Sequence, residues 1–214
     1  MDHLEETAER IHAHFEKVTA ARDHALAQSR TLTRHCANAI RAVHREEWEL
    51  AGEHLAECRQ IIAAMRMELA DHPEIFYAGY TQDALKEYAE ASLVYALVQN
   101  SNLPTPETLE LEYATYLQGL AEAAGELRRR CLDCLLHGQA SEAERLLDHM
   151  DDIYGVLVTM DYPDAITGGL RRLTDIVRGV TERTRGDLTL SLRQQQLEHS
   201  LASMEQRLKE LGNE

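Results

Sequence analysis

Two pairs of glutamates have the spacing of residues that share one face of a helix. Glu87 and Glu90 are three residues apart, and Glu122 and Glu126 are four residues apart, in two stretches rich in Ala and Leu. In a helix, side chains at these spacings have Cβ atoms about 5–6 Å apart. If the two helices pack face to face, four carboxylates meet among packing residues, where a hard divalent cation would compensate their charge.

A solvated helix face explains the same spacing without any metal ion. Glutamate favours helices, and the chain has 37 Asp and Glu among its 214 residues. Acids three or four residues apart are therefore common on exposed helical surfaces. The spacing alone leaves both interpretations open.

The composition predicts a single all-α domain over residues 1–214. Only 4 prolines, 11 glycines and 2 phenylalanines occur, and Ala, Leu, Glu and Arg are abundant, which favours long helices over sheets and their turns. Hydrophobic residues make up 44% of the chain and charged residues 28%, which is typical of globular proteins. A chain of this length usually forms one domain.

Helical periodicity and its interruptions predict about seven helices in an elongated bundle. The predicted helices cover about residues 4–45, 47–69, 81–100, 106–137, 141–159, 170–184 and 187–211. Thr105 is a plausible N-cap, and Gly138 suits a C-terminal stop. Ser141 and Glu144 have the spacing of a capping box. The two glutamate pairs then lie on the third and fourth helices.

The last predicted helix carries a heptad pattern of apolar residues. The members are spaced 7, 4, 3, 4 and 3 residues apart and are Leu190, Leu197, Leu201, Met204, Leu208 and Leu211. Such a seam packs along a partner helix. The pattern is equally compatible with a partner in another subunit and with one in the same subunit.

The charge pattern combines an acidic whole with local groups of arginines. The net charge of −15 argues against general attraction to nucleic-acid backbones. Arginines nevertheless gather in three places, namely Arg22, Arg30, Arg34, Arg41 and Arg45, then Arg128, Arg129 and Arg130, and then Arg171, Arg172, Arg178, Arg183 and Arg185. They either line an enclosed site for an anion or form solvated ion pairs with neighbouring acids.

Other features predict a cytoplasmic protein without disulfides. No apolar run approaches the roughly 18–20 residues that span a bilayer, and the acidic N-terminus lacks the features of a signal peptide. Four cysteines are too few for a disulfide scaffold at this length. Cys131 and Cys134 form a CxxC without a second such pair, so buried free thiols are expected.

The motifs resemble the translin family, most closely its catalytic branch of translin-associated factor X (Trax) and the prokaryotic Trax-like proteins. The resemblance covers most of the chain and is most specific in the blocks 87–91 and 116–129. It implies an all-helical subunit in a closed, barrel-like oligomer, commonly an octamer, with RNA held inside. It also implies that the subunit is a metal-dependent endoribonuclease.

The same resemblance implies which residues form the site. Glu87, Glu90, Glu122 and Glu126 occupy the family's acidic positions as catalytic residues and as ligands of Mg²⁺ or Mn²⁺. Glu122 stands where Asp is common, so its carboxylate reaches one methylene further. The predicted RNA-binding residues are Arg22, Arg30, Arg34, Arg129 and Arg172. The histidines show no ligand spacing and are not predicted to belong to the site.

The expected function is metal-dependent cleavage of single-stranded RNA inside a homo-oligomer, most simply an octamer. Whether a second, translin-like subunit joins the assembly stays open. Two alternatives remain at this point. One is a non-catalytic oligomer of the translin type that binds RNA or single-stranded DNA, and the other is a structural helical adaptor, which the heptad seam and the acidic charge favour.

Overall fold

The computed structural model describes residues 2–211, and within this range the chain forms nine α-helices and no strand. The helices are α1 (Asp2–His44), α2 (Trp48–Glu68), α3 (Pro73–Phe76), α4 (Gly79–Val98), α5 (Pro106–Leu109), α6 (Tyr113–Leu136), α7 (Ala140–Leu157), α8 (Asp164–Thr167) and α9 (Leu170–Leu211). The all-α prediction is confirmed. The count differs from the predicted seven because three single turns of four residues, α3, α5 and α8, are added and because the last two predicted helices form one helix, α9.

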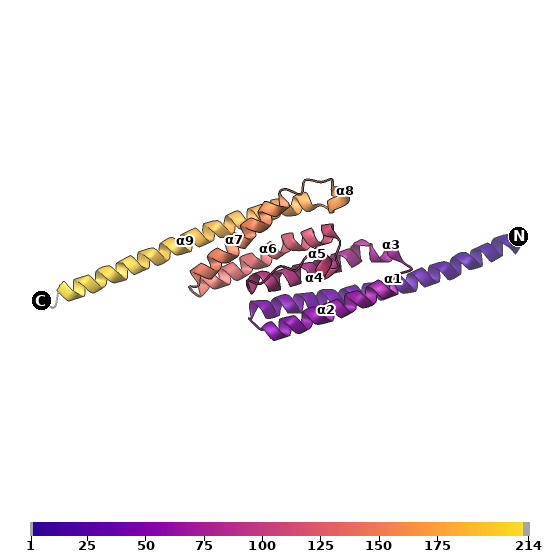
Figure 1. Ribbon diagram of the computed structural model, residues 1–214, viewed down its shortest axis with the longest axis horizontal. Coiled ribbons are helices and arrows are strands. Elements are labelled where there is room, and N and C mark those ends of the chain that lie inside the picture. Colours follow the sequence, from indigo (N-terminus) through magenta and orange to yellow (C-terminus); the bar gives the residue numbers. More distant parts are fainter. Residues whose placement is uncertain (1, 212–214) are drawn as a thin grey trace.

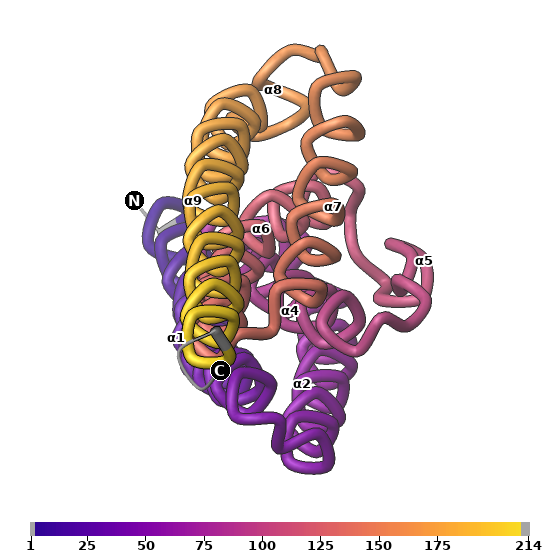
Figure 2. The backbone as a smooth tube through the Cα atoms, turned by 90° about the vertical axis from the view of Figure 1, so that its left-hand side faces the viewer, coloured from indigo at the N-terminus to yellow at the C-terminus, as the bar shows by residue number. Residues whose placement is uncertain are grey.

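The long helices stack in three layers (Figures 1 and 2). The hairpin of α1 and α2 forms the first layer, α4 and α6 form the central layer, and α7 and α9 form the third. Helix α4 contacts α1 on one side and α6 on the other, and α6 also contacts α7 and α9. The two helices that carry the glutamate pairs therefore lie side by side in the middle of the bundle.

Gly119 allows α4 and α6 to approach each other closely. A Cβ atom at this position would lie 2.5 Å from the Cβ of Ala89 and 2.8 Å from the backbone oxygen of Lys86. Both distances are shorter than van der Waals contact, so a side chain at position 119 would push the helices apart. The acids are brought together because their helices touch through backbone and methyl groups at this point.

The prediction of one helix over residues 106–137 is wrong, because the structure divides this stretch into the short helix α5 and the long helix α6. Thr105 does cap the first one, since its hydroxyl oxygen accepts a hydrogen bond from the backbone N–H of Thr108 at 3.2 Å. Glu110 then adopts a left-handed backbone with φ of 55°, which ends α5 after one turn. The turn buries Leu109 and Leu111 on either side of it, which offsets the strained residue.

The boundary between α6 and α7 agrees with one of its two sequence signals and differs from the other. Gly138 follows the end of α6 with a positive φ of 72°, as the C-terminal stop requires. The capping box of Ser141 and Glu144 is wrong, because α7 begins earlier, at Ala140, and its N-cap Gln139 makes no side-chain cap hydrogen bond.

The predicted break between residues 184 and 187 is also wrong, because α9 runs without interruption through Gly186. A single glycine within a helix costs only about 1 kcal/mol. Contacts with α6 offset that cost, since Arg128 donates a hydrogen bond to the Thr184 hydroxyl at 3.0 Å and pairs with Asp187 at 2.9 Å. Leu188, one turn beyond Thr184, is buried.

The heptad seam lies on the free part of α9, which extends beyond the bundle at the end opposite to the projecting N-terminal part of α1 (Figure 1). Leu190, Leu197, Leu201, Met204 and Leu208 are 52–68% exposed. The seam is therefore not covered within this chain, and packing against another subunit stays a prediction. The side chain of Leu211 lies outside the described residues.

The cysteines follow the expectation of free thiols. All four are buried and unbonded, and the sulfur atoms of Cys36 and Cys58 lie 3.6 Å apart between α1 and α2. In the part of the chain that the structure describes, no helix combines the length and the apolar character needed to cross a membrane.

A candidate metal centre between α4 and α6

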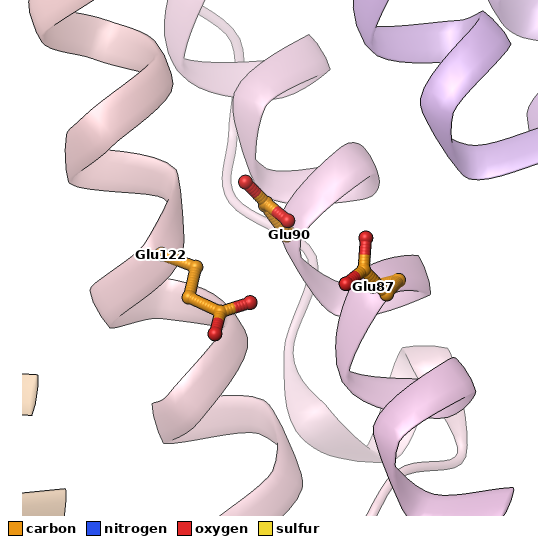
Figure 3. A group of neighbouring side chains, drawn as sticks. All are labelled: Glu87, Glu90 and Glu122. Carbon is orange, nitrogen blue, oxygen red and sulfur yellow. The ribbon is translucent and has the colours of Figure 1, made fainter. Parts of the chain in front are cut away.

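Three of the four predicted glutamates converge between the central helices (Figure 3). Glu87 and Glu90 extend from α4, and Glu122 reaches across from α6. Each offers a carboxylate oxygen, and these oxygens lie within 4.8 Å of one another. Glu87, Glu90 and Glu122 are called the carboxylate triad below. Among the side chains that the structure describes, those of residues 3–210, no other cluster of three potential metal ligands is found.

The triad carries negative charge that the protein does not fully compensate. Glu90 is only 9% exposed, and burial together with the charges of Glu87 and Glu122 raises the pKa of its carboxyl to about 8. Burial and the charge of Glu122 also raise the pKa of Glu87. Three convergent carboxylates, two of which have raised pKa values, are a donor set that fits a hard divalent cation.

Glu126 lies one turn beyond Glu122 but is held by a different partner. Its carboxylate Oε2 accepts a hydrogen bond from Nε2 of His44 at 2.5 Å, and Arg129 lies 3.9 Å away. The hydrogen bond from His44 lowers the pKa of Glu126 despite its partial burial. The structure therefore brings three of the predicted acids together and places the fourth beside them, against α1.

His44 is a residue of this region that the sequence analysis left out. It is the last residue of α1, its side chain is 5% exposed, and its Nδ1 atom is buried without a hydrogen-bond partner. The contact with Glu126 spans 82 positions in the sequence, so no local spacing could reveal it. The one available signal was its place at the end of block 39–44, which resembles the family.

Lys86 is the second residue that the sequence analysis missed. Its Nζ atom donates a hydrogen bond to Oε1 of Glu122 at 2.8 Å, and the two side chains are 17% and 29% exposed. Burial acts to lower the pKa of Lys86, but the hydrogen bond and charge of Glu122, with the charges of Asp83 and Glu87, outweigh burial and raise it. Lys86 is thus a charged group at the edge of the triad.

The triad borders a cavity of about 360 Å³ between α6 and α9. Its lining residues are Glu90, Ala121, Glu122, Ala124, Gly125, Leu173, Ile176, Val177 and Val180. Small residues of α6 leave this space free, and a Cβ atom on Gly125 would meet nothing within 4 Å. Two of the three carboxylates can therefore be approached through a cavity whose other walls are mostly apolar.

The arginines divide into internal and exposed groups. Arg128 is engaged within the chain by its contacts with α9. The five predicted RNA-binding residues are all exposed, namely Arg22, Arg30, Arg34, Arg129 and Arg172. Arg22 forms an ion pair with Asp23 at 3.1 Å, as the alternative of solvated ion pairs expects. The proposed contact of these residues with RNA stays a prediction.

Comparison with known proteins gives consistent results over nearly the whole chain. The model of the Translin family matches residues 6–211. An uncharacterised protein of Methanocaldococcus jannaschii is 32% identical over 184 residues, which are 85% of this chain and 81% of that protein.

Solved structures are similar over a comparable range. The structure of AfC3PO in complex with duplex RNA has a TM-score of 0.80 and 31% identity, and the match covers 86% of this chain and 96% of that one. The structure of apo-NeC3PO has a TM-score of 0.78 over the same shares but only 20% identity, so it shows similarity of fold alone.

Proposed function

Because the chain belongs to the Translin family, we propose that it is a metal-dependent endoribonuclease of the Trax type. The observation that carries the proposal is the carboxylate triad. A subunit that only bound RNA would gain nothing from three acids that converge between its central helices, where the pKa values of Glu87 and Glu90 are raised. Such an arrangement is useful when a cation is bound there.

In this proposal Glu87, Glu90 and Glu122 hold Mg²⁺ or Mn²⁺, which have the preference for oxygen ligands that the triad offers. When bound, the ion supplies charge neutralisation at the phosphate and activation of the attacking group. Glu126, the acid beside the triad, belongs to the same catalytic site. His44 keeps its carboxylate ionised and fixed in direction.

We propose single-stranded RNA as the substrate, held inside a homo-oligomer that is most simply an octamer with closed symmetry. The similar protein AfC3PO was solved with duplex RNA, which supports RNA as the class of ligand. The net charge of −15 opposes adhesion of RNA to the exterior, and a limited interior favours flexible strands. Light scattering at micromolar concentration should give the mass of an oligomer, and a monomeric mass would contradict the assembly.

The test is cleavage of an end-labelled single-stranded RNA by wild type, Glu90→Gln and Glu144→Gln, with Mn²⁺ or with a chelator. A duplex of the same sequence serves as the second substrate. Glu144 is an exposed acid of α7 and gives a matched control for the loss of one carboxylate. Wild type and Glu144→Gln should cut the single strand only with metal, and Glu90→Gln should lose most of the cleavage.

Other outcomes identify the alternatives. Binding of RNA without any cleavage by wild type would instead support a non-catalytic oligomer. Absence of RNA binding even at low salt would support a structural adaptor, because contacts with phosphates are strongest under that condition.

A further inference from the structure

The ammonium group of Lys86 lies close enough to the carboxylate triad to repel a cation bound there. Lys86 extends from α4 and donates a hydrogen bond to Glu122 of α6 at 2.8 Å, so it bridges the same two helices as the triad. Asp83 and Glu87, on the same helix, also attract this charge. In the metal-free chain, Lys86 is therefore the positive charge that partly compensates the triad.

An ammonium group and a divalent ion both require the carboxylate of Glu122. The triad oxygens lie within 4.8 Å of one another. An ion among them and an ammonium that remained bound to Glu122 would therefore repel each other strongly. We propose that Lys86 is a built-in counter-cation, which occupies Glu122 until a divalent ion displaces it and which thereby sets the metal affinity of the site. This inference rests on the proposed function in that it takes the triad as the metal site.

The position of Lys86 suits such an exchange. Its backbone is fixed, because its carbonyl oxygen lies directly against Gly119 where the two helices touch. Its side chain is long and flexible and is 17% exposed, so the ammonium can leave toward water without movement of either helix. His44 does not suit such an exchange, because its side chain is only 5% exposed and because it binds Glu126, which lies outside the triad.

The exchange has a consequence for selectivity among cations. A monovalent ion brings no more charge than the ammonium that it would replace, whereas a divalent ion brings twice as much. Lys86 therefore raises the concentration at which any metal ion fills the site and excludes monovalent ions most strongly. A neutral residue at position 86 should remove this competition.

The experiment is direct titration of Mn²⁺ into the full-length protein without RNA, by calorimetry and by electron paramagnetic resonance of free Mn²⁺, at fixed pH and salt. The proteins are wild type, Lys86→Met, Lys86→Arg and, as a ligand control, Glu122→Gln. Lys86→Met should bind Mn²⁺ about tenfold more tightly, as expected for release of one partly exposed charged hydrogen bond. Lys86→Arg keeps a cation beside Glu122 and should stay near the wild-type affinity, and Glu122→Gln should bind more weakly.

The sign of the effect separates competition from a merely structural role. If the ion pair only held α4 and α6 together, its loss would loosen the triad and weaken Mn²⁺ binding. Unchanged or weaker binding by a folded Lys86→Met protein would therefore overturn the inference, and Lys86→Gln provides a second neutral variant if the first does not fold. Absence of Mn²⁺ binding by wild type would overturn the proposed metal site itself, which is a distinct result.

Discussion

Replacement of Glu90 by Gln should stabilise the metal-free protein, and the gain should grow as the pH rises. Glu90 is nearly buried on α4 and faces Glu87 and Glu122. Gln has almost the same shape and carries no charge, so the substitution removes the electrostatic cost without leaving a cavity. The variant loses a proposed metal ligand, so it should gain stability and lose cleavage together.

The size of the gain in the free energy of unfolding follows from the pKa of Glu90, which is raised from 4.5 to about 8 in the folded protein. Because the folded form binds the proton more tightly than the unfolded form, the stability that the protonated carboxyl contributes is fully present below about pH 4.5. It is lost progressively as the pH rises from about 4.5 to about 8. A tenfold change in proton affinity is worth about 1.4 kcal/mol, so the whole loss is about 5 kcal/mol. About 3 kcal/mol of this stability has already been lost at pH 7.

The assay is urea denaturation followed by circular dichroism between pH 5 and pH 9 in the presence of a chelator. The free energy of unfolding of Glu90→Gln should exceed that of wild type by an amount that rises across this range. Glu144→Gln should follow wild type, since that acid is exposed. A difference between Glu90→Gln and wild type that does not change with pH would refute the assignment of a strained, buried carboxyl.

Three further predictions concern the surroundings of the triad. Gly119→Ala should destabilise the fold by about 1–3 kcal/mol and weaken Mn²⁺ binding, because a Cβ forces α4 and α6 apart. Denaturation measures the stability and calorimetry measures the Mn²⁺ affinity. A variant with unchanged stability and affinity would contradict the close contact. His44→Leu should cost about 1–3 kcal/mol of stability, because the partly buried carboxylate of Glu126 loses its hydrogen bond and keeps only the longer contact with Arg129. Mn²⁺ binding by the triad should persist in this variant, and loss of binding would place Glu126 among the ligands. Combined Arg30→Ser and Arg34→Ser should weaken RNA binding and reduce its dependence on salt without changing Mn²⁺ affinity; unchanged RNA affinity in a filter-binding titration would show that this face of α1 does not contact RNA.

Local signals were sufficient for much of the fold and for the core of the candidate site. The cap at Thr105 and the stop at Gly138 depend on backbone chemistry within a few residues, and both were predicted correctly. The spacing of the acids was sufficient to place each pair on one helix, because helical geometry fixes it. The role of Gly119 in the contact could not be predicted, since it depends on which residues of α4 face it.

The remaining features depend on how whole helices are rotated and crossed. Lys86 and Glu122 are 36 positions apart, and His44 and Glu126 are 82 positions apart, so their contacts leave no periodic signal. The rotation of α6 directs Glu122 toward α4 and Glu126 toward α1, although the two acids share a helix face by spacing. Likewise, the predicted break between residues 184 and 187 is absent because Arg128 of α6 contacts Thr184 and Asp187, and local sequence signals do not include such contacts.

The most direct test of the central claim is one titration in which Mn²⁺ binding and cleavage of a single-stranded RNA are followed in the same preparation of wild-type protein. If the carboxylate triad is the metal site of a nuclease, the cleavage rate should rise with the same midpoint as occupancy of the site, and both should disappear in Glu90→Gln. Cleavage that persists in a chelator, or that reaches its maximum without occupancy of the triad, would contradict the account.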